Sequence, residues 1–417
     1  MGLFALGTGV ALSALQCVTA APGDEAVGSD RFVQQDFVIS MWVDPPVDER
    51  ADERYKEMAD AYFNLVIGGS GAHTPEEVAK QLEVCRKHGL GLLVRPTADD
   101  AADYPDGPAC WGYSLRDEPN AAAFPALAEQ VAAVRRERPG KLAYINLFPG
   151  YAPPGALGTE TYDEHVRQFV DITDVDVLSM DHYPAFKPDG DGRDAYCADL
   201  AVMREHSLRK GIPFWNFFNI MPYGPHTDPT ESQVRWQVFT SLAYGAKGVM
   251  YFCYYTPGPG GEFPKGGAII TRDDRRTEHY YQARRLNEQL RNLGPTLMKL
   301  TSTGVYRVTP EDDPAEALKG SPIVNITRDG VDPPHDYLVG AFQHEDGRRA
   351  VLLNNYRFAF TAWPTVTFDA PAEQVLEVDR WTGEERPVID DSPGMDGLQL
   401  SLLDGGGRLF LLPPAAE

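Results

Sequence analysis

The sequence GYSLRDEPN sets three charged residues, Arg116, Asp117 and Glu118, side by side at the end of an apolar run. Adjacent charges are poor material for a core, but they suit the end of a buried strand that opens onto a site. A carboxyl group partly removed from water there has a raised pKa and can donate a proton. Glu118 is therefore a candidate general acid, which Arg116 and Asp117 would orient and tune. The alternative is a strand that ends in a solvated turn, with Pro119 stopping it and Asn120 capping the next helix.

A second carboxylate, Asp181, ends the apolar run in SMDHYP. Glycoside hydrolysis uses two carboxyl groups: one protonates the leaving oxygen, and the other acts as a base, a nucleophile or an electrostatic stabiliser. Asp181 is the first candidate for the second role, and Asp44 is the other contender. Asp181 could instead only fix loops or bind a substrate hydroxyl. Asp117 is a third candidate catalytic residue, or it serves only as an ion-pair partner of Arg116 or Arg95.

The other expected strand ends carry amides, carboxylates and aromatic rings. Amides and carboxylates hydrogen-bond sugar hydroxyls, and aromatic faces contact sugar C–H groups, although a large aromatic residue belongs to a core as often as to a sugar platform. Phosphate chemistry would need a glycine-rich nest or clustered basic residues, and metal chemistry would need several histidines, so no cofactor or metal is expected. The candidate substrate-binding residues are Trp42, Asp44, Arg95, Arg116, Asn146, His182, Tyr183, Trp215, Asn216, Asn219 and Tyr254.

These residues need a scaffold that brings strand ends together, and the chain alternates strand and helix patterns. Continuous apolar runs between amphipathic helices are typical of a parallel sheet covered by helices, and eight such units predict a closed (β/α)8 TIM barrel, an α/β fold, over residues 31–296. One unit departs, because residues 97–110 are too short and loop-like for a helix. Strands are expected at residues 36–46, 63–69, 90–96, 110–119, 141–150, 175–184, 212–222 and 249–255, and helices at 49–63, 74–89, 120–140, 161–172, 196–211, 230–248 and 278–294.

After the last of these helices the pattern changes to short alternating runs joined by turn signals. This pattern predicts an antiparallel β-sandwich over residues 297–417, with hairpin arms at residues 346–356 and 382–388. The sandwich could be only a cover for the barrel helices, or it could be an accessory sugar-binding module.

The first residues have the pattern of a secretory signal. Residues 3–20 are apolar and small, and the composition turns polar after them. We expect a signal peptide over residues 1–20, cleaved before Ala21, and so a secreted or periplasmic protein. Lipid anchoring at Cys17 fits less well because Gln16 precedes it, and a short buried or disordered leader is the alternative. No other stretch predicts a transmembrane segment.

The chain of 417 residues carries a net charge of −23, which argues against nucleic acid or anionic membrane surfaces as partners. Nothing in the pattern indicates an oligomeric state. The five cysteines contain no CxxC pair, so neither a zinc site nor a disulfide scaffold is indicated. Cys85 and Cys253 are expected in the core, and Cys110 could pair with Cys197.

With these residues in place, the sequence resembles the clan A glycoside hydrolases, and among them the family 42 beta-galactosidase-like barrels. The resemblance rests on GYSLRDEPN, on SQVRWQVFTSLAYGAKGVMYFCYY and on RRLNEQLRNLGPTLMKL, and it covers residues 36–297. It implies that Glu118 is the acid/base, with Asp117 in place of the more usual Asn. It also implies a nucleophilic Glu at the end of the seventh strand, but PFWNFFNIMPYG has no carboxylate, and Asn216 or Asn219 stands there.

Three interpretations stay open from this departure. Asp181 or another carboxylate acts as the base of an inverting reaction, the substrate supplies its own nucleophile, or the barrel binds sugar without cutting it. The sequence favours a secreted glycoside hydrolase that acts on a poly- or oligosaccharide, with Glu118 as general acid and Asp181 as base or transition-state stabiliser. The alternative is a noncatalytic glycan-binding protein. A second carboxylate roughly 5 to 9.5 Å from Glu118 would make hydrolysis feasible.

Overall fold

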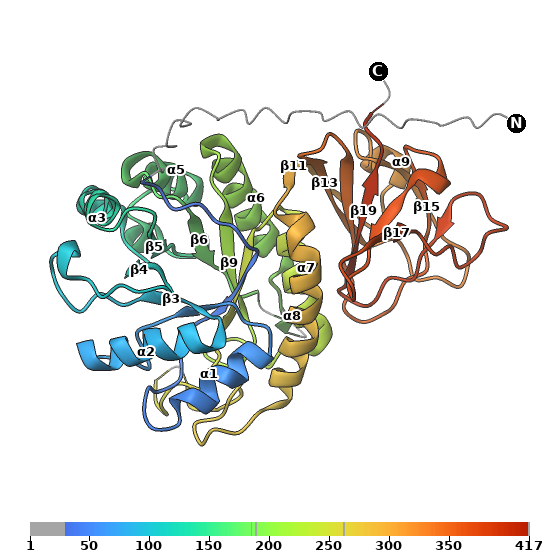
Figure 1. Cartoon of the computed structure of the whole chain (residues 1–417). Coiled ribbons are helices and arrows are strands. Elements are labelled where there is room, and N and C mark those ends of the chain that lie inside the picture. The colour runs from blue at the N-terminus through green and yellow to red at the C-terminus, as the bar shows by residue number, and fades with distance from the viewer. Residues whose placement is uncertain (1–29, 185, 188–189, 262, 416–417) are drawn as a thin grey trace, which may run out of the picture.

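The computed structural model describes residues 30–415 except residues 185, 188, 189 and 262. The predicted signal peptide and Cys17 therefore lie outside the described residues. Figure 1 shows two parts side by side: an α/β domain that runs from β1 to α8, and a β domain that runs from β11 to β19. Of the described helices, none combines the length and the apolar composition needed to cross a membrane.

Eight parallel strands form the centre of the α/β domain, in two four-stranded sheets with the orders β2-β3-β4-β5 and β6-β9-β10-β1. A parallel bridge between Leu147 and Met180 joins the sheets next to β5 and β6. Between β1 and β2, the backbone N–H of Asn64 donates to the carbonyl of Ile39. This arrangement fits a (β/α)8 barrel. The strands are β1 (Val38–Met41), β2 (Leu65–Ile67), β3 (Gly91–Val94), β4 (Cys110–Asp117), β5 (Leu142–Asn146), β6 (Leu178–Asp181), β9 (Phe214–Asn219) and β10 (Gly248–Phe252).

Helices connect successive strands and lie around them (Figure 1). Helices α2 and α7 begin with capping boxes, in which Thr74 and Thr230 each accept a bond from the backbone three residues on. Between β3 and β4 the chain forms only the short helix η1 (Ala101–Asp103), as predicted for that unit. The helices are α1 (Ala51–Asp60), α2 (Pro75–His88), α3 (Phe124–Glu137), α4 (Pro154–Leu157), α5 (Tyr162–Thr173), α6 (Arg193–Lys210), α7 (Glu231–Ala243) and α8 (Glu278–Leu297).

The β domain contains two antiparallel sheets, which fit a β-sandwich over one apolar core. The predicted hairpin arms form the antiparallel pairs β13–β14 and β16–β17. The larger sheet has the order β11 (Leu300–Val308), β13 (Tyr337–His344), β14 (Arg349–Asn355), β19 (Gly407–Leu412), β16 (Leu376–Val378), β17 (Glu385–Pro387). The smaller sheet has the order β12 (Ile323–Thr327), β15 (Thr365–Phe368), β18 (Leu398–Gln399).

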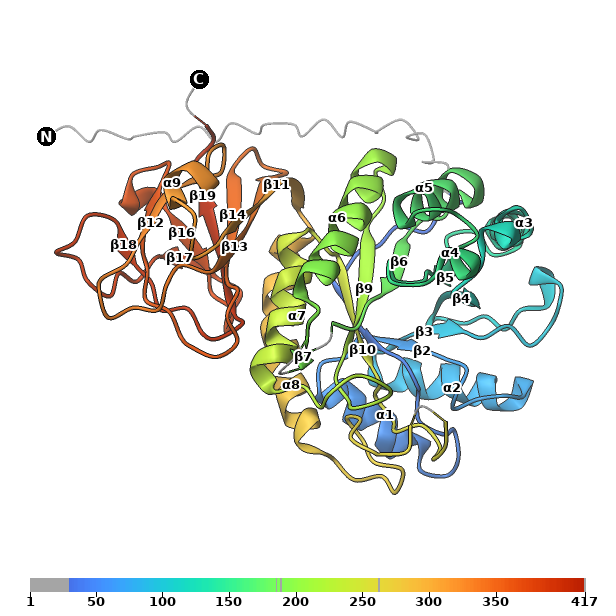
Figure 2. The same ribbon diagram turned by 180° about the vertical axis from the view of Figure 1, so that it is seen from behind.

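The two domains pack together along α7, which contacts β13 and β14 (Figure 2). The approach is close, since a Cβ added at Gly340 would lie 2.3 Å from the carbonyl oxygen of Ala243. A second contact reaches the loop after β6, where the rings of Phe186 and Phe358 meet edge to face at 5.2 Å. In the same region the guanidinium of Arg193 lies over the Phe358 ring. The β domain therefore supports both a helix and a strand-end loop of its neighbour.

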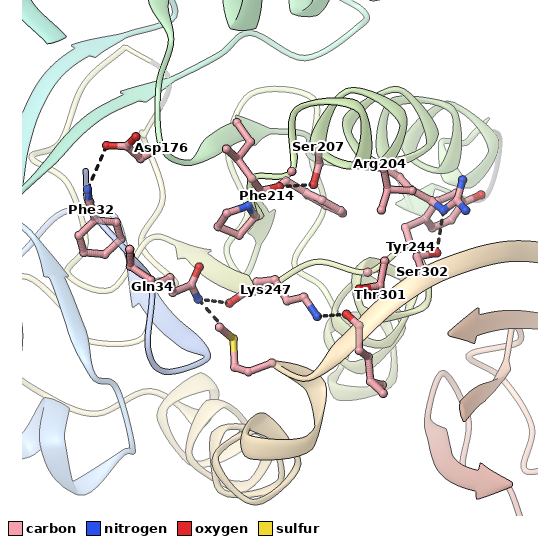
Figure 3. A pocket seen from close by; sticks show the side chains of 18 of the residues that line it. Phe32, Gln34, Asp176, Arg204, Ser207, Phe214, Tyr244, Lys247, Thr301 and Ser302 are labelled. Carbon is pink, nitrogen blue, oxygen red and sulfur yellow. Dashed lines mark hydrogen bonds between the residues drawn. The ribbon is translucent and has the colours of Figure 1, made fainter. Parts of the chain in front are cut away.

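A cavity of about 500 Å³ lies between the domains, at the amino ends of the barrel strands (Figure 3). The ammonium of Lys247 points to the end of α8 and donates to the carbonyls of Leu297 and Leu300. The guanidinium of Arg204 donates to the hydroxyl of Ser302 at 2.7 Å. These cations thus tie the α/β domain to β11.

Candidate active site

Three carboxylates, Asp117, Glu118 and Asp181, meet at the carboxyl ends of β4 and β6, and we call them the carboxylate cluster. Asn146 ends β5 between them, and its Nδ2 group donates to Asp117 Oδ1 at 3.2 Å and to Asp181 Oδ1 at 3.0 Å. The amide is oriented by the Ser179 hydroxyl, which donates to its oxygen at 2.9 Å. Three neighbouring strands thereby hold the cluster in one geometry.

Asp181 is the buried member of the cluster, with 7% of its surface exposed. Burial raises its pKa well above the ordinary Asp value, and the charges of Glu118 and Asp117 raise it further. Hydrogen bonds with Asn146 and Tyr183 act in the opposite direction, because they stabilise the ionised carboxylate. Asp181 and Glu118 are therefore electrostatically coupled acids.

Glu118 is half-buried and has an unusual backbone conformation, with φ of +44°. Left-handed backbone is costly for a residue with a Cβ, so the surrounding structure must hold it. Its backbone N–H donates to the carbonyl of Asn146 at 2.9 Å. The strand therefore turns sharply at Glu118, immediately after Asp117.

Asp117 faces solvent in the cleft, yet its pKa is raised by partial removal from water. The hydrogen bond from Asn146 and the nearby charge of Arg116 lower it in part. Arg116 and Asp117 do not form a close ion pair in the structure. Both line a pocket of about 350 Å³ beside the cluster, which we call the arginine pocket. Its other lining residues are Trp42, Val43, Ile67, Gly68, Gly69, Ser70, Arg95, Ser114 and Leu115.

A group of aromatic residues lies at or after the ends of β6, β9 and β10, and sequence reasoning missed them, except for Tyr183. Tyr183 contacts Phe252 at 4.9 Å and Tyr223 at 5.7 Å, and Tyr223 contacts Phe263 at 5.7 Å. We call Tyr183, Tyr223, Phe252 and Phe263 the aromatic wall. The sequence could have indicated Tyr223 and Phe263 as site residues, since they lie in the loops that follow β9 and β10.

Two further residues at the cleft lie in loops that were not considered. The hydroxyl of Tyr151, which follows β5, accepts a hydrogen bond from the backbone N–H of Tyr183. Removal from water raises the pKa of Tyr151, and the charges of Asp181 and Glu118 raise it further. The ring of His226 lies 4.7 Å from that of Tyr223. Burial lowers the pKa of His226 to about 4, so this histidine is neutral at pH 7.

Three of the predicted binding residues are buried supports of the mouth. Asp44 accepts bonds from the backbone of Ser70 at 2.8 Å and from the side chain of Gln81, and burial raises its pKa. His182 Nδ1 bonds Asp199 at 2.6 Å, which anchors the end of β6 to α6. The Asn219 side chain accepts a bond from the backbone N–H of Met221 at the end of β9.

Three other predicted binding residues do not reach the cleft. Trp215 is fully buried, stacks on Tyr144 and donates its indole N–H to Gln34, toward the amino end of the barrel. Asn216 points outward to α6 and α7 and donates to Tyr196 and Ser241 at 2.7 and 3.1 Å. Tyr254 packs on Phe63, on the helix side of the sheet. Correcting these placements leaves Trp42, Arg95, Arg116, Asn146 and Tyr183 at the cleft with the carboxylate cluster.

Other predictions concern metals and cysteines. Over residues 30–415, with their four gaps, no group of three or more His, Cys, Asp or Glu side chains is arranged to hold a metal ion. Cys85 and Cys253 are buried, as expected. Cys110 and Cys197 are both free thiols, so the disulfide considered between them does not form in this structure.

Comparison with known proteins identifies the fold. No protein-family model matches the sequence, and no curated protein is similar to it. Among solved structures, the family 42 beta-galactosidase Gan42B is similar with a TM-score of 0.57 and 10% identity, over 93% of this chain and 99% of that chain. The beta-galactosidase from Bacillus circulans sp. alkalophilus is similar with a TM-score of 0.51 and 11% identity, over 90% and 99%.

A catalytic mutant of Gan42B from G. stearothermophilus gives a TM-score of 0.51 at 9% identity, over 92% of this chain and 100% of that chain. At these identities the likeness concerns the fold. The chain thus has the fold of these family 42 beta-galactosidases, as the resemblance in its sequence motifs implies.

Proposed function

We propose that this protein is a glycoside hydrolase whose proton donor is Glu118. The observation that carries the proposal is the coupled pair of carboxyl groups, Glu118 and Asp181, at adjacent strand ends. Active sites of such barrels lie at this end of the strands, and two carboxyl groups flanking a cleft are the machinery that glycoside hydrolysis needs.

The pair is suited to proton donation because two neighbouring carboxylates do not both ionise readily. The pair resists losing both protons, because burial and the charges of Glu118 and Asp117 raise the pKa of Asp181. Glu118 is the more accessible of the two, so it is placed to protonate the glycosidic oxygen. In the reactive form that we propose, Glu118 holds the proton and Asp181 is ionised, with its charge stabilised by the hydrogen bonds from Asn146 and Tyr183.

The ionised Asp181 acts as a base toward water or stabilises the positive charge that develops on the sugar ring. Strand β9, Phe214–Asn219, carries no carboxylate, so the proposal does not include a nucleophile from that strand. An inverting reaction or assistance from a 2-acetamido group of the substrate remains compatible with this site. Trp42 and the aromatic wall offer faces for sugar rings.

The test is hydrolysis of a panel of aryl glycosides and polysaccharides by the wild type and by Glu118→Gln and Asp181→Asn. Loss of activity in both variants would support catalysis by the pair of carboxyl groups. Glu129→Gln, at an exposed position of α3, is the control and should stay active. Loss in Glu118→Gln alone would point to a different base or to the substrate itself. If the wild type cleaves no substrate but binds a glycan, the proposed hydrolase function is wrong and the protein is a glycan-binding protein.

We also propose that the protein is exported, with residues 1–20 as its signal and residues 31–296 and 297–417 as its two domains. Support for export comes only from the apolar run at residues 3–20 and the small residues before Ala21. Expression of the full chain in a bacterial host, followed by N-terminal sequencing of the periplasmic fraction, should give Ala21 as the first residue. A lipid attached at Cys17, or an intact Met1 in the cytoplasm, would contradict it.

A further inference from the structure

Two arginine side chains lie beside the carboxylate cluster. Arg95 follows β3 and Arg116 is on β4, and both line the arginine pocket. Among the described residues, no carboxylate lies within ion-pair distance of either guanidinium, although most arginines of this acidic chain have one. The carboxylate that shares the pocket, Asp117, is already bonded to Asn146 and has a raised pKa. The pocket therefore presents more positive than negative charge.

The backbone of the loop after β2 positions Arg95. Its guanidinium Nη1 donates to the carbonyl of Gly69 at 3.3 Å. Gly69 has φ of +131°, and a Cβ added there would lie 3.1 Å from Arg95 Cδ, so the side chain lies directly against this glycine. A single weak contact leaves most of the five guanidinium N–H donors available to a ligand.

The remaining walls suit one sugar ring. The indole of Trp42 lines the pocket and packs edge to face against Phe217 at 5.9 Å, which fixes the ring. The volume of about 350 Å³ lies within the range of small-ligand sites. Because Asp117 belongs both to this pocket and to the carboxylate cluster, a ring bound here adjoins the bond that Glu118 would protonate.

We propose that the arginine pocket binds an anionic group of the substrate, either the carboxylate of a uronic acid or a sulfate ester on the sugar. The planar guanidinium fork matches the oxygens of both groups, which makes arginine the usual partner for them. The net charge of −23 repels anions at long range, so recognition would depend on these two local contacts. This inference rests on the proposed hydrolase function and names its substrate class.

The experiment compares matched aryl glycosides: glucuronide against glucoside, galacturonide against galactoside, and 6-sulfated against unsulfated galactoside, each as both anomers. The wild type should favour an anionic member over its neutral match by about tenfold or more in kcat/KM. Arg95→Gln, Arg116→Gln and Gly69→Ala should each reduce that ratio, mainly through KM. Arg86→Gln, at an exposed position of α2, is the matched control and should leave the ratio unchanged. Preference for the uronide or for the sulfated sugar separates the two sources of charge.

The failure of this inference differs from failure of the proposed function. Cleavage of neutral glycosides at an equal or greater rate, with ratios unaffected in the arginine variants, overturns the anionic substrate and leaves the hydrolase intact. If no glycoside is cleaved, calorimetric titration with tetragalacturonate, a sulfated galactotetraose and neutral galactotetraose decides. Binding of an anionic probe alone, lost in Arg95→Gln and weakened by salt, supports the pocket without hydrolysis. Binding of the neutral probe alone, or of none, overturns it.

Discussion

The carboxylates of Asp117 and Asp181, carried by separate strands, share one hydrogen-bond donor, the Nδ2 group of Asn146. One amide group thereby fixes the position of one acid relative to the other. The hydroxyl of Ser179 donates to the amide oxygen, so the nitrogen must face the acids. We regard Asn146 as a positioning residue of the proposed reaction.

Replacing Asn146 by Ala should lower kcat/KM by roughly tenfold to a hundredfold, because both acids lose a donor to their charged forms. The pH–rate profile distinguishes this role from a general loss of fold. The removed bond stabilises ionised Asp181, so the limb governed by that acid should move to higher pH. Full activity with an unshifted profile would show that the amide does not position the acids.

Asp181→Asn should stabilise the folded protein at neutral pH. The pKa of Asp181 is raised in the folded state, so the folded protein holds this proton more tightly than the unfolded chain. The free energy of unfolding therefore falls as pH rises from the ordinary Asp pKa of 3.8 to the raised value. The Asn variant lacks this loss.

The measurement is Tm of both proteins between about pH 4 and pH 8. The excess of the variant over the wild type should be positive at pH 8 and should close toward pH 4. Asp103→Asn, an exposed acid on η1, is the control and should show no such trend. If Asp181→Asn is less stable than the wild type at pH 8, burial of the ionised Asp181 carboxylate does not destabilise the folded protein.

The left-handed backbone at Glu118 should appear as a difference between two truncations. Both Glu118→Gly and Glu118→Ala remove the carboxyl group, but only glycine relieves the positive φ. Urea unfolding should therefore find Glu118→Gly more stable than Glu118→Ala by about 1 kcal/mol. At Glu129 in α3 the order should reverse, since glycine weakens a helix. If the alanine variant is the more stable one at both positions, the backbone at Glu118 is not strained.

The contact between α7 and β13 leaves no room for a side chain at Gly340. Gly340→Ala would place its methyl group 2.3 Å from the carbonyl oxygen of Ala243 and must separate the domains or shift a strand. We expect a loss of about 2 kcal/mol or more in unfolding free energy. Gly330→Ala, where a Cβ would meet nothing within 4 Å, should change stability little. Equal stability of the two variants would contradict the close packing.

Much of the fold was predictable because buried parallel strands are continuous apolar runs. The short link between β3 and β4 was equally visible, since residues 97–110 lack an apolar stripe. The same continuity hid the direction of side chains, because an apolar run does not reveal which residues face the barrel interior. Trp215, Asn216 and Tyr254 were placed at the cleft for this reason, and they lie in the core or toward the helices.

The site was predictable where charge marked a strand end and obscure where loops supplied it. Asp117, Glu118 and Asp181 stand out as carboxylates that follow apolar residues. Tyr151 and His226 come from loops whose path depends on distant contacts, and the sequence alone does not fix such paths. Asn146 was identified as a candidate, but its role as the link between two acids depends on the register of β4, β5 and β6.

The edge-to-face contact of Phe186 with Phe358 bears on how this chain can evolve. Phe186 belongs to the loop that leaves β6 just after Asp181 and Tyr183, while Phe358 belongs to the β domain. Exchange of the β domain for an unrelated module would remove the outer support of a loop next to the carboxylate cluster. A substitution at either ring is therefore expected to disturb the packing of both domains.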